Sequence, residues 1–138
     1  MIVDGEGGDV LRTTSGGYPH LTLTYTGAAV DAATLFADGA DAVQPWIGRE
    51  IALTGAVVNS FDKNGRMRYD VLLLPDTGAT AAVEETRSGL ARRLGAGTSV
   101  RPHVTHGIYW SAEEAEAARA AVAAKLPCKV RVTGFTVD

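Results

Sequence analysis

The sequence of 138 residues has a single cysteine, Cys128, and lacks any long apolar run. One thiol excludes an internal disulfide and a structural zinc site built on paired cysteines, which favours a reducing compartment. No window approaches the roughly 18 to 20 consecutive apolar residues that a membrane span needs, and no basic segment followed by an apolar run opens the chain. We therefore expect a cytoplasmic protein with no membrane partner, in the host cytoplasm if the source is viral.

Positive charge is also scarce, because the sequence has 13 Lys and Arg residues against 16 Asp and Glu residues and a formal net charge of -3. A long nucleic acid is attracted through a basic surface, so we expect any nucleotide ligand to be small and no long nucleic acid to bind. Hydrophobic residues at 46% and charged residues at 21% are ordinary values for globular proteins. They exclude a disordered chain, a fibre and a coiled coil, and the length fits a single domain over residues 1–138.

Hydrophobic periodicity predicts an α+β protein in the order strand, helix, two strands, helix, strand, helix, strand. The expected strands are residues 19–27, 51–61, 67–75, 102–110 and 128–137, and the expected helices are residues 31–43, 80–94 and 111–126. The Asn64-Gly65 pair between two β-rich runs predicts a hairpin. Five glycines in residues 1–18 predict an irregular, flexible arm.

The order of elements contains an internal repeat. Pro19-His20-Leu21-Thr22, a helix and a strand ending at Gly55 are echoed by Pro102-His103-Val104-Thr105, a helix and a strand ending at Gly134. Each β-α-β unit cannot bury its own sheet face alone, so two lobes, roughly 19–76 and 98–138, would stabilise one another about an approximate two-fold axis. Such an axis brings equivalent residues face to face.

The two His-x-Thr motifs carry the chemistry. Within a strand, His20 and Thr22 project from one face about 7 Å apart, and His103 and Thr105 do the same. A neutral imidazole can take a proton from a nucleophile while a charged imidazole gives one to a leaving oxygen, and threonine hydroxyls can donate to phosphate oxygens. The pattern therefore predicts catalytic roles for these four residues in phosphodiester cleavage, with no metal and no cofactor required.

The paired motifs, about eighty residues apart and each opening a β-α-β unit, resemble those of the 2H phosphoesterase, or LigT-like, superfamily. The resemblance covers residues 18 to 137, including the hairpin region. It implies a bilobed fold with two antiparallel sheets facing a central groove, and a 2H phosphodiesterase activity with His20 and His103 as the catalytic imidazoles. One departure is that the chain ends at Asp138, where the family's second lobe commonly continues into another strand.

The short, acidic chain also resembles small viral LigT-like enzymes, including the anti-CBASS type found in phage, which destroy cyclic nucleotide immune signals. This implies a cyclic nucleotide or cyclic oligonucleotide as substrate. RNA 2',3'-cyclic phosphate ends, a 2'-5' RNA ligase-like reaction and a non-catalytic cyclic nucleotide-binding module remain alternatives. The nucleobase and ring size of the substrate, the regiochemistry of the product, the division of the acid and base roles between His20 and His103, and the oligomeric state are left open.

Four residues beside the motifs are candidates for substrate binding. Tyr18, Tyr109 and Trp110 have rings that can stack on a base, although core packing or a lobe interface is at least an equal alternative for each. Arg101 is a candidate for holding phosphate. His106 lies three residues after His103, on the opposite face of a strand, so we interpret it as a packed or partly exposed histidine and not as a metal ligand.

Overall fold

The structure is a computed structural model that describes residues 1–5, 8–11, 18–26, 30–95 and 100–137. It confirms the α+β class. The strands are β1 (Ile2–Gly5), β2 (Glu50–Lys63), β3 (Arg66–Pro75), β4 (Val104–Tyr109) and β5 (Cys128–Gly134), and the helices are α1 (Gly8–Leu11), α2 (Ala32–Val43), the 3-10 turn η1 (Gln44–Trp46), α3 (Thr77–Leu94) and α4 (Ala112–Ala123).

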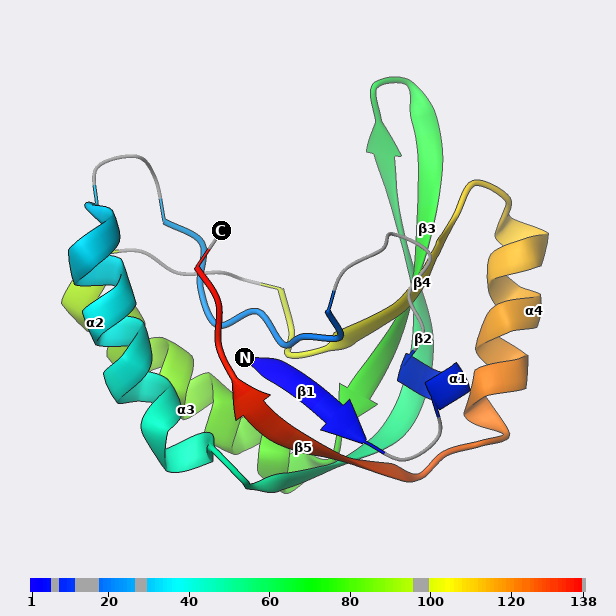
Figure 1. Ribbon diagram of the computed structural model, residues 1–138. Helices are drawn as coiled ribbons and strands as arrows, with labels where there is room; N and C mark the ends of the chain where they lie inside the picture. The colour runs from blue at the N-terminus through cyan, green and yellow to red at the C-terminus, as the bar shows by residue number, and fades with distance from the viewer. Residues whose placement is uncertain (6–7, 12–17, 27–29, 96–99, 138) are drawn as a thin grey trace.

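The described strands form one antiparallel sheet in the order β1-β5-β2-β3-β4. The predicted hairpin is confirmed, with Lys63 paired to Arg66 across a turn in which Asn64 and Gly65 have φ values of 56° and 82°. Positive φ at both central residues is the type I' geometry that matches the twist of the strands. The tip of this hairpin projects beyond the rest of the sheet (Figure 1).

The two edges of the sheet meet through a short segment of the first repeat. β1 and β4 are at opposite ends of the strand order, yet Ile2 of β1 bridges His20 and Val104 of β4 bridges Leu21. Backbone hydrogen bonds from Val3 N to Pro19 O and from Leu21 N to Met1 O, 3.0 and 2.8 Å long, reinforce the first of these bridges. The sheet must therefore curve strongly enough for one segment to reach both edges.

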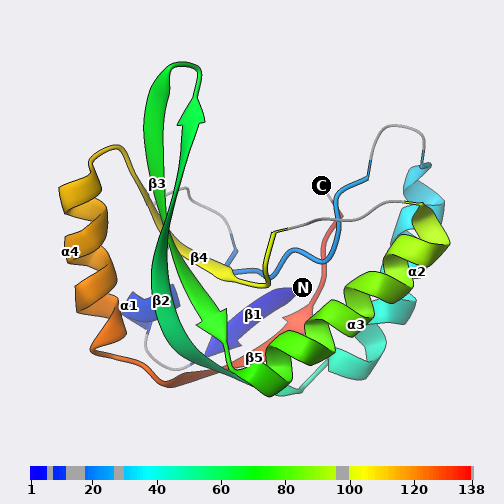
Figure 2. The same cartoon turned by 180° about the vertical axis from the view of Figure 1, so that it is seen from behind.

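The helices stand in two groups at opposite ends of this curved sheet. Figures 1 and 2 show α2 beside α3 at one end, and α4 with the hairpin at the other. Side-chain caps define the N-termini of α2, α3 and α4. The side chains of Asp31, Asp76 and Ser111 each accept a hydrogen bond from the backbone N–H three residues later. No helix in the described part of the chain is long and apolar enough to cross a membrane.

The core is built from the inward-facing residues of the sheet and the helices. Leu21, Leu53, Leu73, Val83 and Val104 are fully buried, so both motif segments are anchored in the same core. On α4, Ala115 and Val122 are buried and Ala118 is partly buried against the core, as is Leu126 just after the helix.

Three expectations differ from the structure. Residues 1–18 are not an irregular arm throughout, because residues 2–5 form an edge strand and residues 8–11 a helical turn that bury Val3, Val10 and Leu11; residues 6–7 and 12–17 lie outside the described part. Residues 20 and 21 make single bridges in place of a regular strand over 19–27. Two facing sheets are not confirmed, because β5 pairs with β2 and joins the described strands of both repeats into one sheet.

Candidate active site

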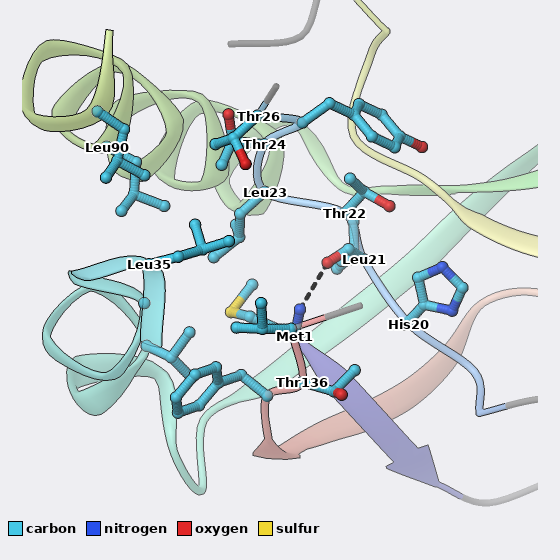
Figure 3. Close-up of a pocket in the computed structure, with 16 residues that line it drawn as sticks. Met1, His20, Leu21, Thr22, Leu23, Thr24, Thr26, Leu35, Leu90 and Thr136 are labelled. Carbon is cyan, nitrogen blue, oxygen red and sulfur yellow. Dashed lines mark hydrogen bonds between the residues drawn. The ribbon is translucent and has the colours of Figure 1, made fainter. Parts of the chain in front are cut away.

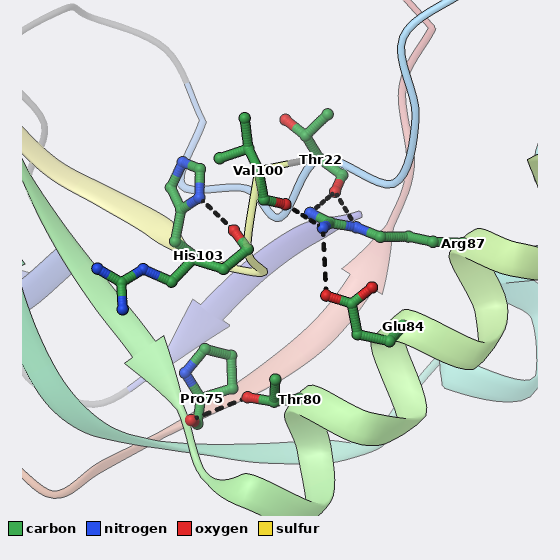
Figure 4. Close-up of polar contacts among 8 residues, drawn as sticks. Thr22, Pro75, Thr80, Glu84, Arg87, Val100 and His103 are labelled. Atoms are coloured by element: carbon green, nitrogen blue, oxygen red, sulfur yellow. Dashed lines mark hydrogen bonds and ion pairs between the residues drawn. The ribbon is translucent and has the colours of Figure 1, made fainter. Parts of the chain in front are cut away.

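The structure brings the two His-x-Thr motifs together. Leu21 and Val104, the central residues, form an antiparallel bridge and are both fully buried. Antiparallel pairing sets His20 opposite Thr105 and Thr22 opposite His103, and alternation directs all four side chains to the face away from the core. Figure 4 shows the His103 ring and the Thr22 side chain on the same side of their segments.

The two imidazoles are held in the same way. His20 Nδ1 lies 2.8 Å from the carbonyl oxygen of Tyr18, and His103 Nδ1 lies 2.8 Å from the carbonyl oxygen of Arg101. A carbonyl oxygen can only accept, so each Nδ1 carries the proton and donates it. The Nε2 atom of each neutral ring therefore keeps its lone pair, which is the form that a general base needs.

Their environments differ in exposure and in charge. His20 is exposed, whereas His103 is partly buried. Burial lowers the pKa of His103 below its ordinary value of 6.5, and the positive charges of Arg87 and His20 add to this, against the opposing effects of the Arg101 carbonyl and Asp70. The reduced pKa keeps His103 predominantly neutral at pH 7.

Arg87 is a buried cation beneath the two motifs. Its Nε and Nη2 atoms donate to the carbonyl oxygen of Thr22 at 3.2 and 2.7 Å, and its Nη1 donates to the carbonyl of Val100. Glu84, one turn earlier on α3, lies 3.8 Å away and supplies a partial counter-charge (Figure 4). One side chain on α3 thus links the segment of the first motif to the segment that precedes the second.

Sequence reasoning missed Arg87. A charged residue in the helix expected over 80–94 is predicted to lie off its buried stripe, and for Arg87 this prediction is wrong, since the residue is only 6% exposed. The spacing carried the signal: Val83, Arg87 and Leu90 are separated by four and three residues and share one face. A buried arginine on an apolar face needs hydrogen-bond acceptors, and two carbonyl groups beside the motifs supply them.

The four residues predicted to bind substrate have different places. Tyr18 and Arg101 are exposed, and their backbone carbonyls orient the two histidines, a role that the sequence did not indicate. Tyr109 is partly buried and packs against the core, opposite Tyr69 of β3. Trp110 is 43% exposed, and its ring lies under the guanidinium of Arg66 at 4.5 Å. The stacking and phosphate-binding roles stay predictions.

His106 is partly buried, and its Nδ1 donates to the carbonyl oxygen of Val10 at 2.6 Å. It therefore anchors α1 to β4, in keeping with its interpretation as a packed histidine. Within the ranges that the structure describes, no three His, Cys, Asp or Glu side chains are grouped as metal ligands would be.

Comparison of the chain with protein-family models, with curated proteins and with solved structures finds no match.

Proposed function

We propose that this chain is a metal-independent phosphodiesterase of the 2H type, which cleaves a phosphodiester in a small cyclic nucleotide or cyclic oligonucleotide. One observation carries the proposal: the Leu21–Val104 bridge places two His-x-Thr motifs side by side, each with its histidine Nδ1 bound to a backbone carbonyl. Two imidazoles with free Nε2 atoms provide an acid and a base in one place, so the reaction needs no metal to activate its nucleophile.

In the proposed reaction His103 is the general base, because its reduced pKa keeps it neutral. On a 2',3'-cyclic phosphate, His103 Nε2 takes a proton from water while the water oxygen forms a bond to phosphorus. The bond from phosphorus to a ribose oxygen breaks, and protonated His20 gives its Nε2 proton to that oxygen. Both histidines exchange protonation states in the step, and water is added across the broken bond.

On a 3'-5' linkage beside a free 2'-hydroxyl, the same residues act on a different nucleophile. His103 takes the proton of the 2'-hydroxyl, whose oxygen attacks phosphorus and forms a 2',3'-cyclic phosphate. The 5'-oxygen leaves and receives a proton from His20. The two routes yield different products, which mass spectrometry separates.

The threonine hydroxyls of Thr22 and Thr105 donate to the non-bridging oxygens of the phosphate. Negative charge on these oxygens grows as phosphorus becomes pentacoordinate, so fixed donors stabilise the transition state more than the bound substrate. The proposed bilobed arrangement supplies one donor from each motif, and each lies opposite the histidine of the other motif.

The preference for a small substrate rests on charge. The net charge of -3 disfavours a long RNA, whereas a cyclic di- or trinucleotide needs only a local site. Destruction of a cyclic nucleotide signal is the corresponding biological role, and viral counter-immunity is its setting in the small viral LigT-like enzymes that the chain resembles.

The deciding experiment incubates the purified chain with a panel of cyclic dinucleotides, cyclic trinucleotides and RNA 2',3'-cyclic phosphate ends, in excess EDTA. We expect turnover of a cyclic oligonucleotide, undiminished by the chelator and abolished in His20→Gln and His103→Gln. Activity that disappears with EDTA would contradict the mechanism. Turnover of RNA 2',3'-cyclic phosphate ends alone would identify the protein as an RNA phosphodiesterase, the alternative named above.

The same panel distinguishes the other classes. A binding module would bind the cyclic nucleotide and release it unchanged. Equilibrium binding with no product detected by mass spectrometry would therefore identify a sequestering protein and not a hydrolase. Joining of paired RNA ends at high concentration would identify a ligase, because the same acid and base can act in reverse.

A further inference from the structure

A cavity adjoins the candidate site. A cavity of about 270 Å³ is bounded by the segment 20–26, by α2 and α3, and by residues 135–137. His20 and Thr22 line it, so it is continuous with the candidate site, and Leu35 and Leu90 lie at the opposite side (Figure 3). A group attached to a phosphate at His20 can therefore enter this cavity without leaving the protein surface.

The lining has two chemically different sides. The helices and the C-terminal segment contribute apolar side chains, namely Leu35, Leu90, Leu94 and Phe135. The motif segment contributes a row of hydroxyl groups at alternate positions, Thr22, Thr24 and Thr26. An apolar surface facing a row of hydrogen-bonding groups suits a flat ring with apolar faces and a polar edge.

One of these hydroxyl groups lacks a partner. The Oγ1 atom of Thr24 is buried and, among the residues described, has no hydrogen-bond partner. A buried hydroxyl without a partner costs free energy, and native proteins keep few such groups. The Thr24 side chain lines the cavity, so rotation about its χ1 bond would bring this hydroxyl to a donor or acceptor on the edge of a ligand.

The apolar wall also depends on a glycine in the middle of α2. A Cβ atom added at Gly39 would lie 3.2 Å from the ring of Phe135, so the glycine allows that ring to pack closely against the helix. Glycine inside a helix lowers its stability. α2 thus has a helix-destabilising residue at a position that shapes the cavity wall.

We propose that this cavity binds the nucleobase of the nucleotide whose phosphate lies at His20 and Thr22, with Thr24 Oγ1 bonded to the edge of the base. The inference rests on the proposed function and deepens it. Binding pockets for drug-sized ligands occupy roughly 300 to 1,000 Å³. At about 270 Å³ the cavity fits a single base, and the rest of a cyclic oligonucleotide remains outside it.

The test measures binding and needs no turnover. Isothermal calorimetry compares the four nucleoside 3'-monophosphates with ribose 5-phosphate, on the wild-type chain, on Thr24→Val and on the control Thr54→Val, whose threonine is exposed on β2 away from the cavity. We expect at least one nucleotide to bind tenfold or more tighter than the sugar phosphate. Thr24→Val should weaken that nucleotide about tenfold and leave the sugar phosphate unchanged, and Thr54→Val should change neither.

A melting curve separates a binding role from a structural role. Valine has nearly the shape of threonine and removes only the unpartnered hydroxyl, so Thr24→Val should keep or raise the melting temperature while it loses nucleotide affinity. A second variant, Leu35→Phe, adds volume at the apolar wall and should weaken the nucleotide by a similar factor.

Two results would overturn the inference: equal binding of nucleotides and ribose phosphate, or unchanged nucleotide affinity in both Thr24→Val and Leu35→Phe. Tighter binding of an alkyl phosphate than of any nucleotide would also overturn it, by assigning the cavity to an aliphatic chain. Because none of these ligands has a phosphodiester, absence of hydrolysis in the substrate panel would refute the proposed enzyme while leaving this result standing.

Discussion

Arg87 donates two hydrogen bonds to the carbonyl oxygen of Thr22, from Nε at 3.2 Å and from Nη2 at 2.7 Å. Its remaining terminal nitrogen donates to the carbonyl of Val100, in the segment that leads to the second motif. The residues so linked are 78 positions apart in the sequence, at 22 and 100. A single planar cation therefore fixes the relative position of two segments whose side chains are proposed to act on the same bond.

The first prediction concerns this linkage. Arg87→Met removes the hydrogen bonds that the guanidinium donates to the Thr22 and Val100 carbonyls, and a hydrogen bond to a charged group contributes about 1.5–3 kcal/mol. We expect the melting temperature to fall and kcat to fall at least about tenfold, because the motifs lose their common support. Arg92→Met, at an exposed position on the same helix, is the matched control and should change neither quantity. Wild-type kcat in Arg87→Met would contradict the positioning role.

The sequence predicted the parts of the fold that depend on short-range signals. The Asn64-Gly65 hairpin and the helices expected at residues 31–43 and 111–126 are each decided by neighbouring residues, and the structure has all three with small differences in their ends. The edge strand at residues 2–5 was not predicted, because it is only four residues long and is stabilised by β5, more than 120 residues away. Long-range pairing of this kind leaves no local pattern.

The candidate site was likewise predictable only in part. The paired motifs were visible as a repeat, and the Leu21–Val104 bridge brings them together. The carbonyls that orient the histidines were not predicted, because a backbone group carries no sequence signal. Arg87 was not predicted, because its charge suggests an exposed position although its helical spacing puts it on the apolar face.

The second prediction is a pH profile. Burial is the largest cause of the low pKa of His103, and the charge of Arg87 lowers it further. We expect the acid limb of kcat/KM to have its midpoint below 6.5, because the base must be neutral. Arg87→Met removes the cation and should move this midpoint to higher pH, whereas Arg87→Lys keeps the charge and should move it less. Identical midpoints in both variants would show that Arg87 acts on His103 only through structure.

The third prediction concerns stability. The pKa of His103 is lower in the folded chain than in the unfolded chain, where it is near 6.5, so the folded state binds fewer protons between the two values. The stabilising contribution of neutral His103 is complete above pH 6.5 and declines as the pH falls through 6.5 toward the folded pKa. Urea unfolding of the wild type should therefore show a steeper loss of free energy from pH 7.5 to pH 5 than unfolding of His103→Gln. Equal slopes would mean that burial does not perturb this imidazole.

The fourth prediction separates the hydroxyl groups of Thr22 and Thr105 from the backbone that carries them. Thr22→Val keeps the carbonyl oxygen that Arg87 binds and keeps the shape of the side chain, so the support of the motif is retained while one donor to the phosphate is lost. Loss of one donor that acts mainly in the transition state typically lowers kcat by about 10²- to 10³-fold. We expect an effect of this size with KM changed less than threefold, and the same for Thr105→Val because it occupies the equivalent place in the second motif. If either substitution raised KM and left kcat intact, that hydroxyl would be a ground-state binding group, and the stabilisation of the pentacoordinate state would have to come from elsewhere in the site.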